Sequence, residues 1–305
     1  MQTPQEHQLL GTGRGIDHFI IAVRDLEKVA QQYQATLGFS VSGSGKHPGG
    51  TENRIARFRN DSYLELLSYY DPEKASDLAS FLHKHEGADG LGIHVSSAEK
   101  TAAFLKARGF QISEGAGTIK LEGVTVTPPV LWRWVAFEDK APPYSLIFFI
   151  EYTKEREELR KNHPEHYPAN PQHHNTAVKV SSAWMAVKDL EDVGSKFESM
   201  GFRSKRRGSL SHLSADYQEI EAGEGTILLL EPRDSSGEIG SFLRERGEAL
   251  CGLSIQVENS KAVQEIVEGT SNERVSRNTG IYGPSVMLSP RLTHGVWMEF
   301  YQSAP

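Results

Sequence analysis

Apolar residues recur along the first 150 positions with two spacings, one typical of strands and one typical of helices. A β-branched run over 16–23 predicts a strand, and apolar positions at helical spacing over 26–37 predict a helix that ends at Gly38. Short apolar segments between Gly-rich or Asn-Asp turns then predict three strands, at 39–42, 54–58 and 63–69. The predicted order is therefore strand, helix and three strands.

A second unit of the same kind follows in the sequence. It opens with a predicted strand at 91–95 and continues with a helix at 98–108, and the strands that follow the helix include those at 132–137 and 145–152. The first half of the chain is thus predicted to hold two βαβββ units.

A longer repeat relates the two halves of the chain. The segment SFLHK followed by GLGIHV recurs near residue 250 as SFLRE followed by GLSIQV, and AVRDLE at 22–27 recurs as AVKDLE at 186–191. The repeat predicts duplicated domains at 14–153 and 178–303. The segment between them, 154–177, begins with charged residues and becomes rich in His, Pro and Asn, which is typical of a linker.

Composition limits the classes of partner. The 305 residues have a formal net charge of −7 and scattered basic residues, so neither nucleic acid nor a membrane is expected as a partner, and a small-molecule substrate is. One cysteine, Cys251, excludes an internal disulfide and suits a reducing compartment. No secretion signal and no apolar run near the roughly 18 residues of a membrane span is present. We expect a cytoplasmic protein, as a monomer or homodimer.

The opening strand GIDHFIIAVRDL, the segment YLELL at 63–67 and the segment FFIEY at 148–152 resemble the vicinal oxygen chelate superfamily. This superfamily includes glyoxalase I, bleomycin resistance proteins, methylmalonyl-CoA epimerase and extradiol dioxygenases. Together with the loop HPGGTEN at 47–53, these segments are similar to its glyoxalase-like domain subgroup. The resemblance implies an α+β fold in which four βαβββ units form two open β-barrel domains. It also implies a divalent metal held by His18, Glu65 and Glu151.

The pattern of the two strands agrees with such a site. Strand alternation places Glu65 on the face of Tyr63 and Leu67, and Glu151 on the face of Phe149, within apolar runs. An ionised carboxylate turned towards an apolar interior costs several kcal/mol unless a cation or strong donors compensate it. Two such carboxylates and one histidine favour a divalent metal. The alternative is that each carboxylate faces water or pairs with an arginine such as Arg57 or Arg133.

A fourth ligand is harder to assign. The resemblance predicts a second histidine on the first strand of the second unit, but alignment places Gly90, not His94, opposite His18. His94 lies four residues further on, roughly 13 Å along the strand. His94 is therefore either a ligand or a core or substrate-contacting histidine, and three protein ligands would leave positions for water and substrate.

Three further residues are candidate substrate contacts. The Gly-rich loop that carries His47 and Asn53 lies where such a barrel opens, and Trp134 shares a strand face with Trp132. The alternatives are an ordinary turn and ordinary aromatic core packing.

The second copy lacks most of these groups. Alignment places Ser182 opposite His18, Leu228 opposite Glu65 and Gln256 opposite His94, and only Glu299, opposite Glu151, is retained. This half is expected to stabilise, shape or cover the first.

The resemblance implies a metal-dependent isomerase or lyase that stabilises an enediolate-like intermediate, with Glu151 or Glu65 as base. The metal would be Zn²⁺, Ni²⁺, Co²⁺, Mn²⁺ or Fe²⁺. Two alternatives stay open, a metal-free protein that binds or sequesters a small molecule, and an extradiol-type dioxygenase, which needs two histidines and one carboxylate.

Overall fold

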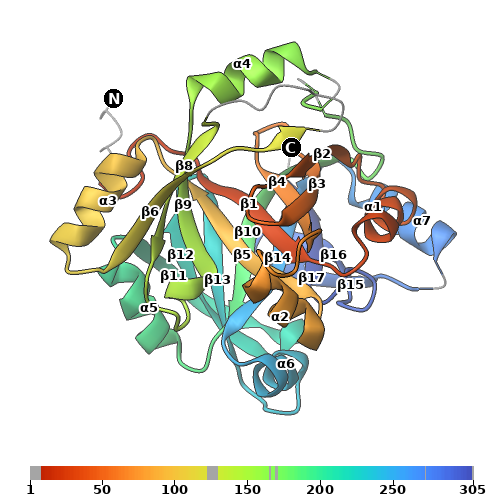
Figure 1. The fold of residues 1–305 in the computed structure, drawn as a ribbon. Helices are drawn as coiled ribbons and strands as arrows, with labels where there is room; N and C mark the ends of the chain where they lie inside the picture. The colour runs from red at the N-terminus through yellow and green to blue at the C-terminus, as the bar shows by residue number, and fades with distance from the viewer. Residues whose placement is uncertain (1–7, 122–129, 165, 169–170, 272, 304–305) are drawn as a thin grey trace, which may run out of the picture.

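The computed structural model describes residues 8–121, 130–164, 166–168, 171–271 and 273–303. They form two curled mixed sheets with seven α-helices around them (Figure 1). The elements of the first half are β1 (Gly15–Ala22), α1 (Leu26–Ala35), β2 (Ser42–Lys46), β3 (Thr51–Arg57), β4 (Tyr63–Tyr69), α2 (Ser76–Lys84), β5 (Gly87–His94), α3 (Ala98–Ala107), β6 (Ile112–Gly117), β7 (Lys120–Leu121), β8 (Trp132–Phe137) and β9 (Ile147–Tyr152).

Helix α4 (Lys154–Asn162) connects the halves. The elements of the second half are β10 (Ala177–Ala186), α5 (Leu190–Ser199), β11 (Arg203–Leu210), β12 (Ala215–Ala222), β13 (Gly225–Pro232), α6 (Glu238–Arg246), β14 (Ala249–Val257), α7 (Ser260–Thr270), β15 (Ser276–Gly280), β16 (Gly283–Leu288) and β17 (Trp297–Gln302). Each half contains two βαβββ units, which confirms the predicted fold class.

Local sequence explains why the helices begin and end where they do. Helix α1 starts after Asp25, whose side chain accepts a hydrogen bond from the backbone N–H of Lys28, and its buried face carries apolar residues at helical spacing. The turn after it needs Gly38, which has a φ of 72°. Helix α3 begins in the same way after Ser97.

The first sheet curls strongly. Its strand order is β6-β8-β9-β5-β1-β4-β3-β2-β7, and the strands at the two ends, β6 and β7, are separated by only residues 118–119. The two ends of the sheet must therefore approach each other, which turns the sheet into an open barrel with an interior. The second sheet has the order β11-β12-β13-β10-β14-β17-β16-β15.

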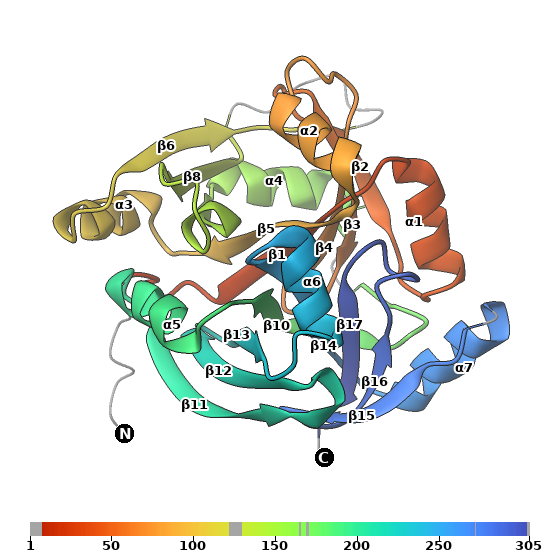
Figure 2. The same ribbon diagram turned by 90° about the horizontal axis from the view of Figure 1, so that it is seen from below.

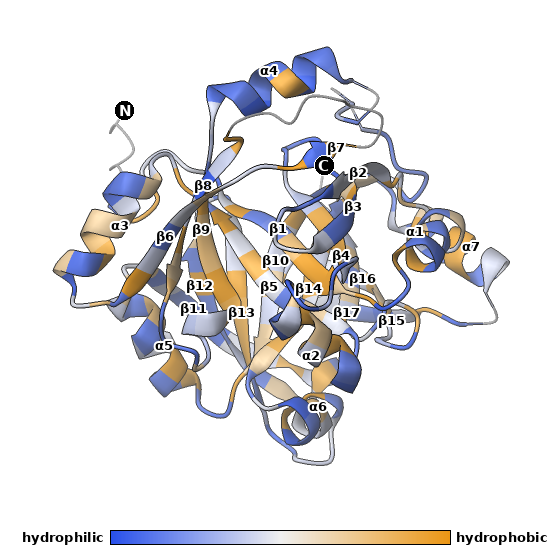
Figure 3. Cartoon of the chain, viewed as in Figure 1, coloured by the Kyte–Doolittle hydropathy of each residue, from blue (hydrophilic) through white to orange (hydrophobic). Residues whose placement is uncertain are grey.

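One hydrophobic core joins the two sheets. Alternate side chains of β1, such as Phe19 and Ile21, are fully buried together with Ala183 and Met185 of β10. One face of the first sheet therefore packs against the second sheet (Figure 2). Its other face packs in part against α2 through Ile20 and Leu67. Apolar residues concentrate on the central strands, whereas α4 is mostly hydrophilic (Figure 3). Among the described residues, no helix combines the length and the apolar character that crossing a membrane requires.

Candidate active site

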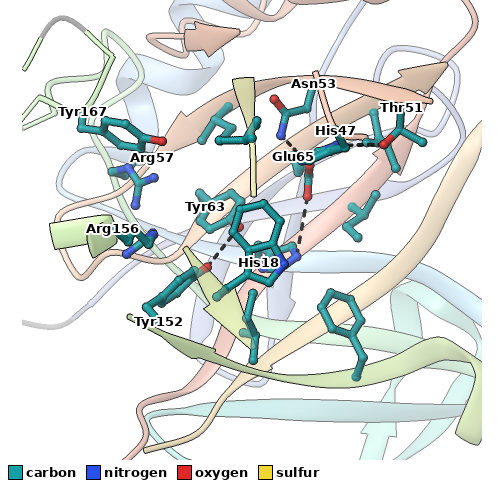
Figure 4. Close-up of a pocket in the computed structure, with 17 residues that line it drawn as sticks. His18, His47, Thr51, Asn53, Arg57, Tyr63, Glu65, Tyr152, Arg156 and Tyr167 are labelled. Atoms are coloured by element: carbon teal, nitrogen blue, oxygen red, sulfur yellow. Dashed lines mark hydrogen bonds and ion pairs between the residues drawn. The ribbon is translucent and has the colours of Figure 1, made fainter. Parts of the chain in front are cut away.

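A cavity of about 220 Å³ lies inside the first sheet. Strands β1, β3, β4, β8 and β9 and helix α4 contribute its walls (Figure 4). The lining residues are His18, Ile20, His47, Thr51, Asn53, Ile55, Arg57, Tyr63, Glu65, Leu67, Ile119, Trp132, Phe148, Ile150, Tyr152, Arg156 and Tyr167.

Strand alternation selects these side chains. On β4, every second residue, Tyr63, Glu65 and Leu67, faces the cavity, as the sequence pattern predicts. The residues between them, Leu64 and Leu66, face the core shared with the second sheet. A carboxylate and a phenol therefore project into the cavity from an otherwise apolar strand.

A bulge in β1 places two neighbouring polar side chains together. Ile16 pairs with Ile93 and His18 pairs with Gly92, so Asp17 is an extra residue with no partner in β5. The carboxylate Oδ2 of Asp17 lies 2.7 Å from Nδ1 of His18, an arrangement that strict alternation would forbid. Gly92 makes room for the imidazole, because a Cβ there would lie 2.3 Å from Cε1 of His18.

Asp17 is fully buried, and hydrogen bonds compensate its negative charge. Besides His18, it accepts hydrogen bonds from the guanidinium of Arg14 and the hydroxyl of Tyr152. Burial raises the pKa of Asp17, but the hydrogen bond and charge of His18, the charge of Arg14 and the bond from Tyr152 together hold it well below its usual range. Asp17 is therefore an ionised acceptor that orients His18.

The other end of the imidazole faces Glu65. Nε2 of His18 lies 3.6 Å from Oε2 of Glu65, and Oε1 of Glu65 accepts a 2.7 Å hydrogen bond from the amide of Asn53. His47 lies beside this group, where Nδ1 contacts the hydroxyl of Thr51 at 2.8 Å and burial lowers the pKa of the ring. Of the predicted site residues, the structure brings together His18, Glu65, Asn53 and His47.

The opposite end of the cavity is basic and aromatic. The guanidinium of Arg57 lies between the rings of Tyr63 and Tyr167, at 5.2 and 5.3 Å from their centroids. That of Arg156, from α4, lies 3.4 Å from the ring centroid of Tyr152. The hydroxyls of Tyr63 and Tyr152, 3.2 Å apart, lie between the two ends (Figure 4).

Glu151 does not join this group. Ile150 and Tyr152 face the cavity, so Glu151 between them faces outward. There its carboxylate accepts a 2.8 Å hydrogen bond from the backbone N–H of Ala98, at the start of α3. The prediction that Glu151 and His18 hold the same metal is therefore wrong. Both faces of β9 are covered, and Glu151 lies on the face that packs against helix α3.

Two other predicted site residues also lie outside the cavity. Nδ1 of His94 accepts a 3.1 Å hydrogen bond from the backbone N–H of Arg14, and His94 pairs in register with Gly15 rather than with His18. The ring of Trp134 packs over Gly115 on the neighbouring strand. These positions correct the expectation that His94 and Trp134 reach the metal or the substrate.

The donors present do not fit the predicted metal centre. Catalytic zinc takes three protein ligands, and the iron site of an oxygenase takes two histidines and a carboxylate. Within the part of the chain that the structure describes, no three His, Cys, Asp or Glu side chains converge on a common point. His18 and Glu65 supply two facing donors, while Glu151 and His94 are turned away.

The second sheet confirms part of the predicted equivalence and corrects the rest. Ser182 takes the place of His18 and Leu228 that of Glu65. Glu299, however, pairs with Ser254 as Phe148 pairs with Gly92, so it is equivalent to Phe148 and not to Glu151. Its buried carboxylate accepts 2.7 Å hydrogen bonds from Ser254 and Ser285.

Several residues of the site were not expected. Asp17 stands next to His18, but only the bulge turns both side chains the same way. Arg156 and Tyr167 belong to the segment interpreted as a linker. The alternation of Asn53, Ile55 and Arg57 along β3 would have predicted that these three side chains share the face that lines the cavity.

Comparison with known proteins agrees with this architecture. The sequence model of a family described as a glyoxalase-like domain matches residues 16–201. No curated protein matches the chain.

Two solved structures show the same fold over nearly the whole chain. A hypothetical protein from Staphylococcus aureus is 12% identical with a TM-score of 0.63, and the match covers 94% of this chain and 98% of that one. A triple mutant of 4-hydroxymandelate synthase from Streptomyces coelicolor is 12% identical with a TM-score of 0.62, covering 96% of this chain and 94% of that one. Methylmalonyl-CoA epimerase from Mycobacterium tuberculosis is 19% identical with a TM-score of 0.39, and the match covers 43% of this chain and 91% of that one.

Proposed function

The chain belongs to the glyoxalase-like domain family of the vicinal oxygen chelate superfamily, and from this premise we propose that it is an enzyme that moves a proton on a small-molecule substrate in the cavity of its first half. One observation carries the proposal. Nε2 of His18 and Oε2 of Glu65 face each other at 3.6 Å in the cavity, while Asp17 and Asn53 hold their other ends. Two positioned acid–base groups of this kind suit isomerase or lyase chemistry.

His18 acts as the base. Because Asp17 is ionised, it favours the tautomer of His18 that carries its proton on Nδ1 and leaves a lone pair on Nε2. This lone pair takes a proton from a carbon next to a carbonyl group, and the electron pair of the broken C–H bond moves towards the carbonyl oxygen. The imidazolium that forms is stabilised between the carboxylates of Asp17 and Glu65.

Glu65 is the second acid–base group. Its carboxylate takes the proton from the imidazolium of His18 and then gives it to the neighbouring atom of the enolate, which returns His18 and Glu65 to their starting states and moves the proton without loss or gain of an atom. The amide of Asn53 binds the other carboxylate oxygen and fixes the direction of the transfer. No step is assigned to a metal, because the donors around the cavity do not form the predicted ligand set.

The test is exchange of substrate carbon-bound hydrogen with deuterium oxide, followed by NMR over a panel of small carbonyl compounds. We expect the wild-type protein to catalyse exchange on at least one of them, and His18→Gln and Glu65→Gln to lose it by about 100-fold or more, the usual range for a general acid or base. Glu151→Gln is the matched control, because this carboxylate lies outside the cavity.

The contrary result is a wild-type protein that binds members of the panel without exchanging any of them. The cavity would then belong to a binding protein, the metal-free alternative that the sequence left open. Exchange that survives equally in His18→Gln and Glu65→Gln would show that other groups carry the proton.

A further inference from the structure

We propose that Arg57 and Arg156 bind the carboxylate of the substrate, so that this protein acts on small monocarboxylates with an apolar body. The inference rests on the proposed function, because it names the substrate class of the same cavity. It comes from the basic end, defined by Arg57, Arg156 and Tyr167, which takes no part in the proton transfer.

Arg57 is a buried cation with an open donor. Its side chain is 3% exposed and lines the cavity, yet Nη1 donates no hydrogen bond among the described residues. The nearest carboxylate oxygen belongs to Asp61, at 3.8 Å, and that oxygen already accepts a 2.6 Å hydrogen bond from Arg160. Since a buried charged donor without a partner is costly, the cavity offers a place for an anion.

The aromatic contacts position the guanidinium but do not neutralise it. Arg57 lies between Tyr63 and Tyr167, and Arg156 lies over Tyr152. Such contacts lie on the faces of the guanidinium plane, so the Nη1 edge of Arg57 is left for a planar anion. A carboxylate is the group that matches the guanidinium fork.

The charges at this end favour a monoanion. Three guanidinium groups, those of Arg57, Arg156 and Arg160, share two carboxylates, those of Asp61 and Glu157, so that one positive charge is in excess. Both carboxylates are more than one third exposed and therefore compensate weakly. Burial is the main cause that lowers the pKa of Arg57, and the charges of Arg156 and Arg160 lower it further.

The cavity also sets the orientation of the substrate. The basic end lies opposite the His18 and Glu65 end in Figure 4, with the hydroxyls of Tyr63 and Tyr152 between them. Ile55 and Ile150 are among the apolar residues that line the space. A carboxylate at the basic end would thus direct the rest of an apolar acid towards the proton-transfer groups.

The first arm of the test is isothermal titration of the full-length protein with three probes: 3-phenylpropanoate, its primary amide and 2-phenylethylphosphonate. None has the ketone needed for exchange, so binding is read apart from catalysis. We expect the carboxylate to bind saturably and the amide about 30-fold or more weakly, the usual scale for losing one partner of a buried charge pair. Equal binding of acid and amide, or binding of the phosphonate dianion in clear preference, would overturn the proposal.

The second arm uses Arg57→Met, with Arg59→Met as the matched control. Arg59 lies two residues further along, outside the cavity, and pairs with Glu258 at the surface. We expect Arg57→Met to lose about 30-fold in affinity for 3-phenylpropanoate and Arg59→Met to bind as the wild type does. If Arg57→Met fails to fold, the acid and amide comparison in the wild type still decides the question.

The two proposals fail differently. Carboxylate binding that needs Arg57, with no deuterium exchange on any acid or ketone, supports this inference and refutes the proposed function. Exchange on a keto acid that is as fast in Arg57→Met as in the wild type refutes this inference and leaves the proposed function standing.

Discussion

Replacing Asp17 by Asn removes the charge that orients the proposed base. The carboxylate accepts hydrogen bonds from His18, Arg14 and Tyr152 and is fully buried, so solvent cannot compensate for the loss of its charge. The amide of the variant donates to Nδ1 of the imidazole and leaves the proton on Nε2, which is then no longer a base. In a catalytic triad the same change costs about 10⁴-fold. With the two-carboxylate site here we expect a fall of about 10³–10⁴-fold in the exchange rate, or about 4–5 kcal/mol.

The assay is the deuterium exchange rate at saturating substrate, with the unfolding midpoint measured on the same sample. KM should change little, because Asp17 does not line the cavity. Tyr152→Phe is the control, since it removes one hydrogen bond from Asp17 but leaves the charge and the contact with His18. A folded Asp17→Asn protein whose exchange rate stays within tenfold of the wild type would refute the assignment of His18 as an oriented base.

Three further predictions follow from single contacts. Burial and the charge of Glu65 raise the pKa of Asp89 to about 6, so the folded state binds its proton more tightly and the free energy of unfolding falls as the pH rises from about 4 to 6. In urea titrations, the free energy of unfolding of Asp89→Asn should exceed that of the wild type by about 1–3 kcal/mol at pH 8 and equal it at pH 4. Glu151→Gln should lose about 0.5–1 kcal/mol of stability at the start of α3 and keep full exchange activity; a loss of activity in the folded variant would return Glu151 to the site. Gly92→Ala should slow exchange by about 100-fold because the new Cβ displaces the imidazole of His18, and unchanged kinetics would contradict the described position of the ring.

The fold was predictable because its signals are local and repeated. Each βαβββ unit has a β-branched opening strand, a helix with apolar residues at helical spacing and a Gly after it, and the segment at 22–27 recurs at 186–191. The inward direction of Glu65 was also predictable, since Tyr63 and Leu67 share its face.

The rest of the site depends on strand packing, a bulge and the path of a helix, which the alternation of apolar and polar residues does not predict. Glu151 also lies in an apolar strand, but both faces of that strand are covered, so an apolar run does not say which face holds the cavity. Asp17 reaches His18 only through a one-residue bulge. Arg156 reaches the cavity because α4 folds back over the first sheet, and a charged segment between two repeats is ordinarily solvated.

The central claim is that His18, oriented by Asp17 and facing Glu65, moves the substrate proton without a metal. The most direct measurement is the exchange rate of one wild-type sample before and after chelation, with its metal content determined at both stages. The account predicts an unchanged rate in protein that holds far less than one equivalent of any divalent metal. Exchange that disappears on chelation and returns with a stoichiometric divalent cation would contradict it.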